Sequence, residues 1–175
     1  MFNLDRLTAD RLRHVLSYDE QNGEFRWVVR INNRIQIGQI AGYASGGYRR
    51  ISIDGVTYLA HRLAWLYMTG EWPSNQIDHI DENGLNNAFG NLRGATASQN
   101  RCNRGAQSNN RSGFKGVSWF KKTKKWRARI RIAGQAKTLG YFSDPAEAHE
   151  LYGLAAEMLH GEFANLGHSA AHLDQ

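Results

Sequence analysis

The sequence predicts an α+β protein that combines short antiparallel strands with a few short helices. Strand-like runs rich in β-branched and aromatic residues recur along the chain, and turn-forming pairs such as Asp54-Gly55 separate them. Apolar residues at helical spacing occur in segments between these runs. A polar run of turn-forming residues from 101 to 112 then divides the chain, which predicts more than one compact part.

Residues 1–60 are predicted to form an N-terminal αβ region. Thr8 is placed to cap a short amphipathic helix. Asn22-Gly23 then forms a turn that leads into a strand over residues 24–29. Residues 42–47 have the composition of a loop.

A β-hairpin and a second helix are predicted next. Residues 48–53 and 56–60 flank Asp54-Gly55, which is a pair that favours a tight hairpin turn. Apolar residues over 63–67 follow helical spacing, and Gly70 marks the end of that helix.

A carboxylate beside an imidazole, with carboxamides downstream, is the most informative chemical feature of the chain. Asp78 and His79 lie between two isoleucines, as at the end of a buried strand, and Asn91 and Asn100 follow. An aspartate oxygen and an amide carbonyl suit Mg²⁺, which keeps several waters and accepts phosphate as a ligand. An imidazole can take the proton of an attacking water near neutral pH. These residues predict metal-assisted phosphodiester hydrolysis.

The order of elements around this motif would bring its side chains together. Asn83-Gly84 offers a tight turn, after which residues 85–91 are expected to return as a second strand. Thr96 or Ser98 would then begin a helix that carries Asn100. Strand, loop, strand and helix in this order form a ββα-metal arrangement.

These residues resemble the HNH endonuclease motif of phage and intron-type enzymes, a group that includes homing endonucleases. The resemblance is carried by Ile77-Asp78-His79-Ile80-Asp81, Asn86-Asn87, Asn91-Leu92-Arg93, Ser98-Gln99-Asn100 and the upstream His61-Arg62-Leu63-Ala64-Trp65. It implies that Asp78 and Asn100 bind one Mg²⁺ or Mn²⁺ ion. His79 would be the general base, and Asn91 would orient the histidine.

Three further positions qualify this resemblance. Asn100 stands where many relatives have histidine, which argues for a single hard ion instead of zinc. Arg93 is a candidate accessory residue. His61 is a second one, either as a structural hydrogen-bonding residue at a strand-to-helix junction or as a residue that touches DNA or the site. The nuclease core is expected to span residues 61–105, and a linker to span 106–111.

Residues 112–166 are predicted to form a small separate domain, followed by a tail over 167–175. Residues 116–120, 126–132 and 136–142 have the pattern of a three-stranded antiparallel meander. A helix is expected to follow it, because Asp144, Pro145 and Glu147 provide an N-cap, an N1 proline and an N3 glutamate. The apolar stripe of this helix continues to Gly161 and would pack on one face of the sheet.

The other face of this sheet is predicted to bind nucleic acid. Strand alternation places Arg127, Arg129 and Arg131 on one face, and arginine can bind phosphates or read guanine in the major groove. The turn before them extends the positive surface with Lys121, Lys122, Lys124 and Lys125. The alternative is that these arginines only solubilise the sheet.

The C-terminal residues also resemble the AP2 DNA-binding domain. The resemblance is carried by Ser112-Gly113-Phe114-Lys115-Gly116-Val117, Trp119, Trp126, Gly140-Tyr141-Phe142 and residues 146–156. It implies that the sheet enters the major groove, and it adds Trp119 and Trp126 to the expected DNA-binding residues.

The composition agrees with a polyanionic partner. The net charge is +6 with a pI near 9.7, and residues 111–137 hold ten Lys and Arg but no Asp or Glu. Cys102 is the only cysteine, which excludes an intrachain disulfide and a cysteine-based zinc cluster. No apolar stretch reaches the ~18 residues of a membrane span, and no signal-peptide core is present at the N-terminus. We therefore expect a cytoplasmic protein of phage or mobile-element type in a host cell.

Together these patterns predict a monomeric, Mg²⁺-dependent HNH endonuclease that cleaves or nicks double-stranded DNA and is targeted by an AP2-like sheet. The alternative is a sequence-specific DNA-binding regulator whose core does not cut.

Overall fold

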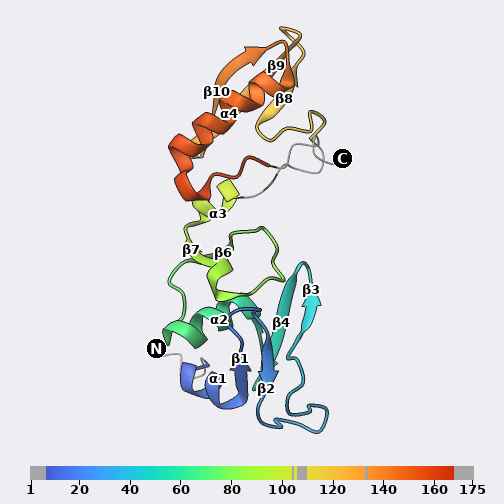
Figure 1. Cartoon of the computed structure of the whole chain (residues 1–175), viewed down its shortest axis with the longest axis vertical. Coiled ribbons are helices and arrows are strands. Elements are labelled where there is room, and N and C mark those ends of the chain that lie inside the picture. The colour runs from blue at the N-terminus through green and yellow to red at the C-terminus, as the bar shows by residue number, and fades with distance from the viewer. Residues whose placement is uncertain (1–6, 104, 106–109, 133, 168–175) are drawn as a thin grey trace. The chain divides into compact units, whose positions relative to one another are not determined.

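The computed structural model of the chain describes residues 7–103, 105, 110–132 and 134–167. The chain divides into two compact units, Met1–Ala95 and Thr96–Gln175. Both contain helices and short antiparallel sheets, which agrees with the predicted α+β class (Figure 1). The division falls before the helix that carries Asn100, whereas the expected nuclease core grouped that helix with Asp78.

The first unit begins with a helix and a two-stranded sheet. Helix α1 spans Ala9–Val15, and the Oγ1 atom of Thr8 accepts a hydrogen bond from Arg11 N at 3.2 Å, so the predicted N-cap is confirmed. Strands β1 (Leu16–Tyr18) and β2 (Phe25–Trp27) pair antiparallel. The second strand is shorter than the expected run because only its central residues join the ladder.

Strands β3 (Tyr43–Ser45), β4 (Tyr48–Ile53) and β5 (Val56–Leu59) form a three-stranded antiparallel sheet. The hairpin between β4 and β5 is confirmed, and its two turn residues have the positive φ angles that such a turn requires, 50° and 81°. Strand β3 corrects the expectation of a loop over residues 42–47. Tyr43, Ala44 and Ser45 pair with β4, a contact that local composition does not reveal.

Helix α2 (Ala60–Thr69) ends at Gly70, which has the left-handed conformation expected of a C-cap. Strand β6 (Gln76–His79) then pairs antiparallel with β7 (Leu92–Ala95), and the short 3₁₀ helix η1 (Phe89–Asn91) precedes β7. This register places Asp78 opposite Arg93 and His79 opposite Leu92.

The predicted second strand over residues 85–91 was wrong, because residues 85–88 form a loop and Phe89–Asn91 form η1. Its polar side chains bond to backbone N–H groups two residues on: Asp81 Oδ1 accepts from Asn83 N, and Asn83 Oδ1 accepts from Leu85 N. Asn86 Oδ1 likewise accepts from Ala88 N. Such turns compete with strand pairing, so the ladder begins only at Leu92.

The core of the first unit supports the strand that carries the candidate site. Fully buried residues from α1, β1, β2, β4 and α2 form one cluster, which Ile77 of β6 and Leu92 of β7 join. The following strand positions, Asp78 and His79, are only 4% and 6% exposed. The candidate carboxylate and imidazole therefore lie on a rigid, buried part of the fold.

The second unit contains helix α3 (Ala97–Asn103), a three-stranded sheet and helix α4 (Pro145–His160). Strand β9 (Lys125–Ile132) lies between β8 (Val117–Phe120) and β10 (Gln135–Phe142), and a 3₁₀ helix η2 (Gly161–Phe163) follows α4. The predicted meander and its helix are confirmed. Helix α4 lies along one face of the sheet (Figure 1).

Buried apolar residues make the contact between α4 and the sheet. Ala128 and Ile130 of β9 are buried, as are Ala148 and Ala156 of α4. Of the predicted linker, residues 106–109 lie outside the described residues, and so does the predicted tail from 168 onward. In the described part of the chain, none of the helices has the length and apolar character that crossing a membrane requires.

Candidate functional site

Asp78 and Arg93 form a buried ion pair across the β6–β7 ladder. The Nε and Nη2 atoms of Arg93 lie 3.0 and 2.9 Å from the same carboxylate oxygen, Oδ2 of Asp78. The Arg93 and Asp78 side chains are 13% and 5% exposed. A buried carboxylate needs such a partner, because desolvating an unpaired charge is costly. Arg93 thus holds one oxygen of the candidate metal ligand.

Replacing Arg93 by methionine is expected to destabilise the first unit by about 3–5 kcal/mol, because the Asp78 carboxylate would stay buried without its cation. Urea unfolding followed by tryptophan fluorescence measures this change. The matched control is Arg11→Met, which breaks the exposed ion pair between Arg11 and Asp54. That pair is exposed to solvent, so breaking it should lower the free energy of unfolding much less. Equal decreases in both variants would contradict the prediction.

His79 is oriented by a buried carboxamide, that of Asn87. The His79 Nε2 and Asn87 Oδ1 atoms are 3.3 Å apart, and Asn87 is 1% exposed. The amide nitrogen of Asn87 donates to Leu85 O at 3.1 Å, so its oxygen is the acceptor toward the ring. Nε2 then carries the hydrogen, which leaves the lone pair on Nδ1. Nδ1 is therefore the basic nitrogen of His79.

The turn between β1 and β2 holds Asn87 in place. Gly23 has φ of 74°, and a Cβ atom there would lie only 2.2 Å from the backbone carbon of Asn87. The Tyr18 hydroxyl also donates to Asn87 O at 2.6 Å. Glycine is required at this turn because the two backbones meet closely. The N-terminal αβ region thereby packs against the loop that orients His79 and stabilises its position.

The structure gives Asn91 a role that differs from the predicted one. Its amide nitrogen donates to Asp81 Oδ1 at 2.8 Å and to Asn86 O at 2.9 Å, and its oxygen accepts from Asp81 N at 3.1 Å. Both amide hydrogens are used in closing the loop, whereas the described contact to His79 Nε2 comes from Asn87. The Asn86-Asn87 pair within the motif was the signal for this contact, but spacing alone does not show which carboxamide meets the ring.

The same loop stabilises the charge of Asp81. Burial would raise the pKa of this carboxyl group, but hydrogen bonds from Asn86, Asn91 and Asn83 N, with His79 nearby, hold that pKa below its ordinary value. Asp81 is therefore ionised at neutral pH and serves as the acceptor around which the loop is organised.

A second histidine lies against His79. The rings of His61 and His79 meet edge to face with centroids 4.9 Å apart, and the ring of Tyr48 lies 5.5 Å from His61 and 6.0 Å from His79. His61 is 6% exposed, and its Nδ1 atom has no hydrogen-bond partner among the described residues. His61 lies at the predicted junction between β5 and α2, and its two predicted roles, structural hydrogen bonding or contact with DNA or the site, stay predictions. Tyr48 had no sequence signal, since it reaches the site only through the fold.

Burial, the neighbouring His79 and Arg62 lower the pKa of His61 to about 3 from an ordinary value of 6.5. Below pH 6.5 the unfolded chain binds a proton that folded His61 excludes. The contribution of neutral His61 to the free energy of unfolding is complete above pH 6.5. As the pH falls from 6.5 toward 3, this contribution is lost at up to about 1.4 kcal/mol per pH unit.

We therefore expect His61→Gln to flatten the fall in unfolding free energy between pH 6.5 and pH 3, because glutamine does not titrate. Urea unfolding at a series of pH values measures this slope. The control is His14→Gln on the exposed face of α1, which should keep the wild-type slope. A wild-type slope in His61→Gln would contradict the prediction.

Asn100 lies on α3, in the second unit. It is half-buried, and its backbone N–H donates to Thr96 O at 3.0 Å within the first turn of the helix. Among the described residues, no group of three or more His, Cys, Asp and Glu side chains is arranged to hold a metal ion. The predicted ligand set of one carboxylate and one carboxamide is of a different kind and stays a prediction.

The sheet of the second unit places the three predicted arginines on the face opposite α4. Ala128 and Ile130 point to the helix, so Arg127, Arg129 and Arg131 alternate to the other side. The guanidinium carbon of Arg127 lies 4.8 Å from the centre of the Phe120 ring, which holds this side chain flat on the sheet. The lysines of the β8–β9 turn are exposed: Lys121, Lys122, Lys124 and Lys125.

The two predicted tryptophans do not share the arginine face. Trp119 and Trp126 are cross-strand partners with ring centroids 5.1 Å apart, and strand alternation places them on the side of Ala128. Trp126 packs against the core there. The aromatic residues on the arginine face are Phe120 and Tyr141, whose ring centroids are 5.3 Å apart. Their positions follow from register, which the sequence motif did not provide.

Comparison with known proteins identifies the family. The HNH endonuclease family matches residues 58–102, a segment that runs from β5 to α3. Protein 3.8 of Escherichia phage T7 is 35% identical over 105 residues, which are 59% of this chain and 86% of the phage protein. The chain belongs to the HNH endonuclease family.

This HNH nuclease has a further viral relative. The uncharacterized HNH endonuclease L560 of Acanthamoeba polyphaga mimivirus is 36% identical over 116 residues, which are 65% of this nuclease and 59% of the viral protein. No solved structure matches the chain. The matched family segment contains Asp78, His79 and Asn100, so the buried side chains of β6 belong to the HNH region of the enzyme.

Proposed function

We propose that this nuclease hydrolyses phosphodiester bonds of double-stranded DNA, with one Mg²⁺ or Mn²⁺ ion held by Asp78 and Asn100. The observation that carries the proposal is the buried Asp78-His79 pair, with each side chain held by its own partner, Arg93 or Asn87. A carboxylate and an imidazole in adjacent strand positions are the groups that ion binding and proton transfer require.

The donor atoms of this site fit a hard divalent ion. The Asp78 carboxylate, which Arg93 holds through Oδ2, would supply an oxygen ligand to the ion. A carboxylate and a carboxamide oxygen match Mg²⁺, which takes few protein ligands and keeps several waters. When bound, the ion supplies charge stabilisation for the phosphate and for the leaving oxygen. The protein ligand from the second unit would be Asn100.

His79 would act as the general base. Its Nε2–H donates to Asn87, so Nδ1 is the atom that takes a proton from the attacking water. The bond to Asn87 holds the ring at one orientation, which aligns the basic nitrogen before substrate binds. Asn91 contributes indirectly, because its carboxamide closes the loop around Asp81 that leads to Asn87.

His61 and Arg93 would be accessory residues of the same site. The neutral His61 ring offers a buried Nδ1 atom beside His79, and a water bound there would satisfy it. Arg93 would orient the Asp78 carboxylate through the ion pair. Neither residue needs to exchange a proton with substrate in this scheme.

The basic sheet would bind the DNA duplex, and its resemblance to the AP2 domain supports this role. Arg127, Arg129 and Arg131 repeat along β9 at about 6.6 Å, which suits successive phosphates of one strand. Phe120 holds Arg127 flat, so less conformational freedom is lost on binding. The exposed lysines of the adjoining turn add positive charge.

One site per chain favours a monomer that nicks one strand first, and relatives encoded by a phage and a virus favour action on DNA inside a host cell. The test is conversion of supercoiled plasmid to open-circular DNA by the full-length protein in Mg²⁺, in Mn²⁺ and in EDTA. The proposal requires cleavage with either ion and none in EDTA. Cleavage that persists in EDTA would overturn the metal assignment, and DNA binding without cleavage would favour a regulator.

A further inference from the structure

Helix α3, which carries the predicted metal ligand Asn100, has little apolar packing of its own. It has seven residues, all of them described, and Asn103 is the one that is buried. A helix of this length is not stable in water without outside contacts. The position of Asn100 therefore depends on what holds α3.

The N-terminus of α3 is capped by hydrogen bonds between Thr96 and Gln99. Thr96 Oγ1 accepts from Gln99 N at 3.3 Å, and Gln99 Oε1 accepts from Thr96 N at 2.9 Å. This reciprocal cap stabilises the first turn. It does not attach α3 to the rest of its unit, so the attachment must come from other residues.

Two side chains from beyond the predicted linker bind the carbonyl end of α3, and we call Lys115 and Asn165 the α3 clamp. Lys115 Nζ donates to Cys102 O at 2.8 Å and to Asn165 O at 2.7 Å. Asn165 Nδ2 donates to Asn103 O at 2.8 Å. The last carbonyl groups of a helix lack partners within it and carry partial negative charge, so an ammonium and an amide satisfy them well.

The clamp is itself anchored in the second unit. The backbone oxygen of Lys115 lies 3.1 Å from His149 Nδ1 on α4. Lys115 also directly precedes Gly116, where a Cβ atom would lie 2.1 Å from the ring of Tyr152. These contacts connect the Lys115 backbone to the helix that packs on the sheet.

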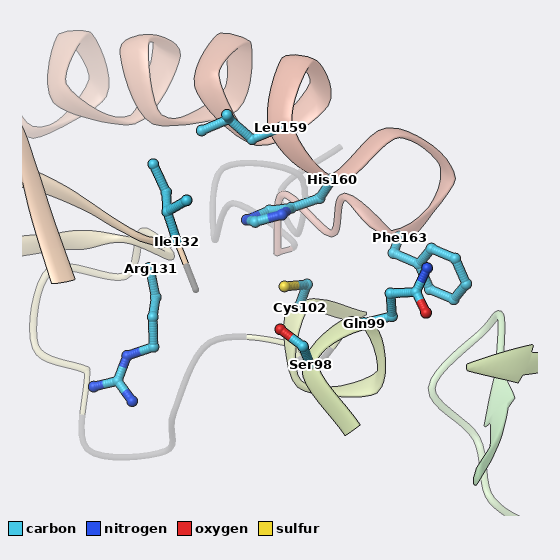
Figure 2. Close-up of a pocket in the computed structure, with 8 residues that line it drawn as sticks. All are labelled: Ser98, Gln99, Cys102, Arg131, Ile132, Leu159, His160 and Phe163. Atoms are coloured by element: carbon cyan, nitrogen blue, oxygen red, sulfur yellow. The ribbon is translucent and has the colours of Figure 1, made fainter. Parts of the chain in front are cut away.

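Apolar packing does not replace the clamp on the side of α3 that faces α4. A cleft of about 260 Å³ lies within the second unit between α3 and the ends of β9, α4 and η2 (Figure 2). Ser98, Gln99 and Cys102 line it from α3, while Arg131 and Leu159 line it from the other elements (Figure 2). Side chains therefore do not fill this space, and the α3 clamp contributes more to holding α3 against the rest of the second unit.

We propose that Lys115 is a positioning residue of the nuclease, which holds α3 through Cys102 O and so keeps Asn100 in the conformation that binds the ion. The inference rests on the proposed function, because it takes Asn100 as the ligand. It makes part of the C-terminal domain a component of the metal site, in addition to any role in DNA recognition. Removing residues 112–175 would then weaken metal binding although Asp78, His79 and Asn100 remain.

The test uses the full-length protein in a His79→Ala background, so that bound duplex DNA is not cleaved. Electron paramagnetic resonance measures Mn²⁺ binding, and hydrogen exchange measures the opening of the α3 amides. Lys115→Met is expected to weaken Mn²⁺ binding about tenfold or more and to speed exchange in α3. Lys115→Arg should restore most of both, because it returns a cationic donor. The control Lys137→Met, an exposed lysine on β10, should change neither.

Unchanged exchange in the β9 amides would establish that Lys115→Met is folded, and Asn165→Leu should produce the same two effects through the other half of the clamp. The inference is overturned if Lys115→Met binds Mn²⁺ like its parent while Asn100→Ala does not bind it. If the parent itself binds no Mn²⁺ in the presence of DNA, the proposed metal site fails, and this inference fails with it.

Discussion

Replacing His79 by alanine is expected to lower Mg²⁺-dependent cleavage about 10²–10⁴-fold, because the attacking water loses the base that accepts its proton. The variant should still bind DNA, since the ring is buried and contributes no charge to the basic sheet. Nicking of supercoiled plasmid and a binding assay on an uncleaved duplex measure the two properties separately. A parallel His79→Gln variant distinguishes loss of the base from loss of packing.

The matched control for this experiment is His14→Ala, which removes an exposed imidazole from α1. It should cleave like the wild type. Cleavage by His79→Ala at the wild-type rate would contradict the assignment of His79 as the general base. A general loss of folding would be visible as a changed unfolding midpoint, and glutamine at position 79 would then supply the decisive measurement.

Replacing Arg127, Arg129 and Arg131 together by glutamine is expected to weaken DNA binding and to flatten its salt dependence. Removing one phosphate contact reduces the slope of log K against log salt by about 0.9, so removing three would reduce it by about 2.7. Affinity at low salt should fall by about 10²–10³-fold if each arginine contributes about 1 kcal/mol or more. Binding to one duplex over a range of salt concentrations measures both quantities.

A control with the same change in net charge separates direct phosphate binding from general attraction. Replacing Arg30, Arg34 and Lys137 by glutamine removes three cations that lie outside the arginine face. This variant should keep most of the salt slope. If the two triple variants show the same decrease in slope, the sheet face has no special role, and its arginines serve mainly to keep the protein soluble.

The three kinds of defect would also distinguish the proposals from each other. The His79 substitution should lower the rate of cleavage without affecting DNA binding. The arginine substitutions should weaken DNA binding, and cleavage should then recover at high DNA concentration. Substitution of Lys115 should act on Mn²⁺ binding. A C-terminal truncation would combine the second and third effects, so it cannot by itself measure DNA targeting.

Much of the local structure followed from local patterns. The Thr8 cap, the turn at Asp54-Gly55, the end of α2 at Gly70 and the three-stranded meander with α4 depend on residues close in sequence. These were predictable because caps and tight turns have strict conformational requirements that only a few residue types meet. The conformation of residues 85–91 was not predictable, because local periodicity favours a strand there equally well. Side-chain-to-backbone hydrogen bonds in this segment form turns that compete with strand pairing.

The sequence by itself determined the chemistry that the site can offer. Asp78 and His79 are adjacent in the chain, and their place on a strand followed from the isoleucines around them. The tertiary structure decided which groups surround them. It brought Asn87, Arg93 and His61 to the pair, and it attached the carbonyl end of α3 to Lys115. Such contacts join residues far apart in the chain, and they depend on how whole elements pack, which short-range patterns do not encode.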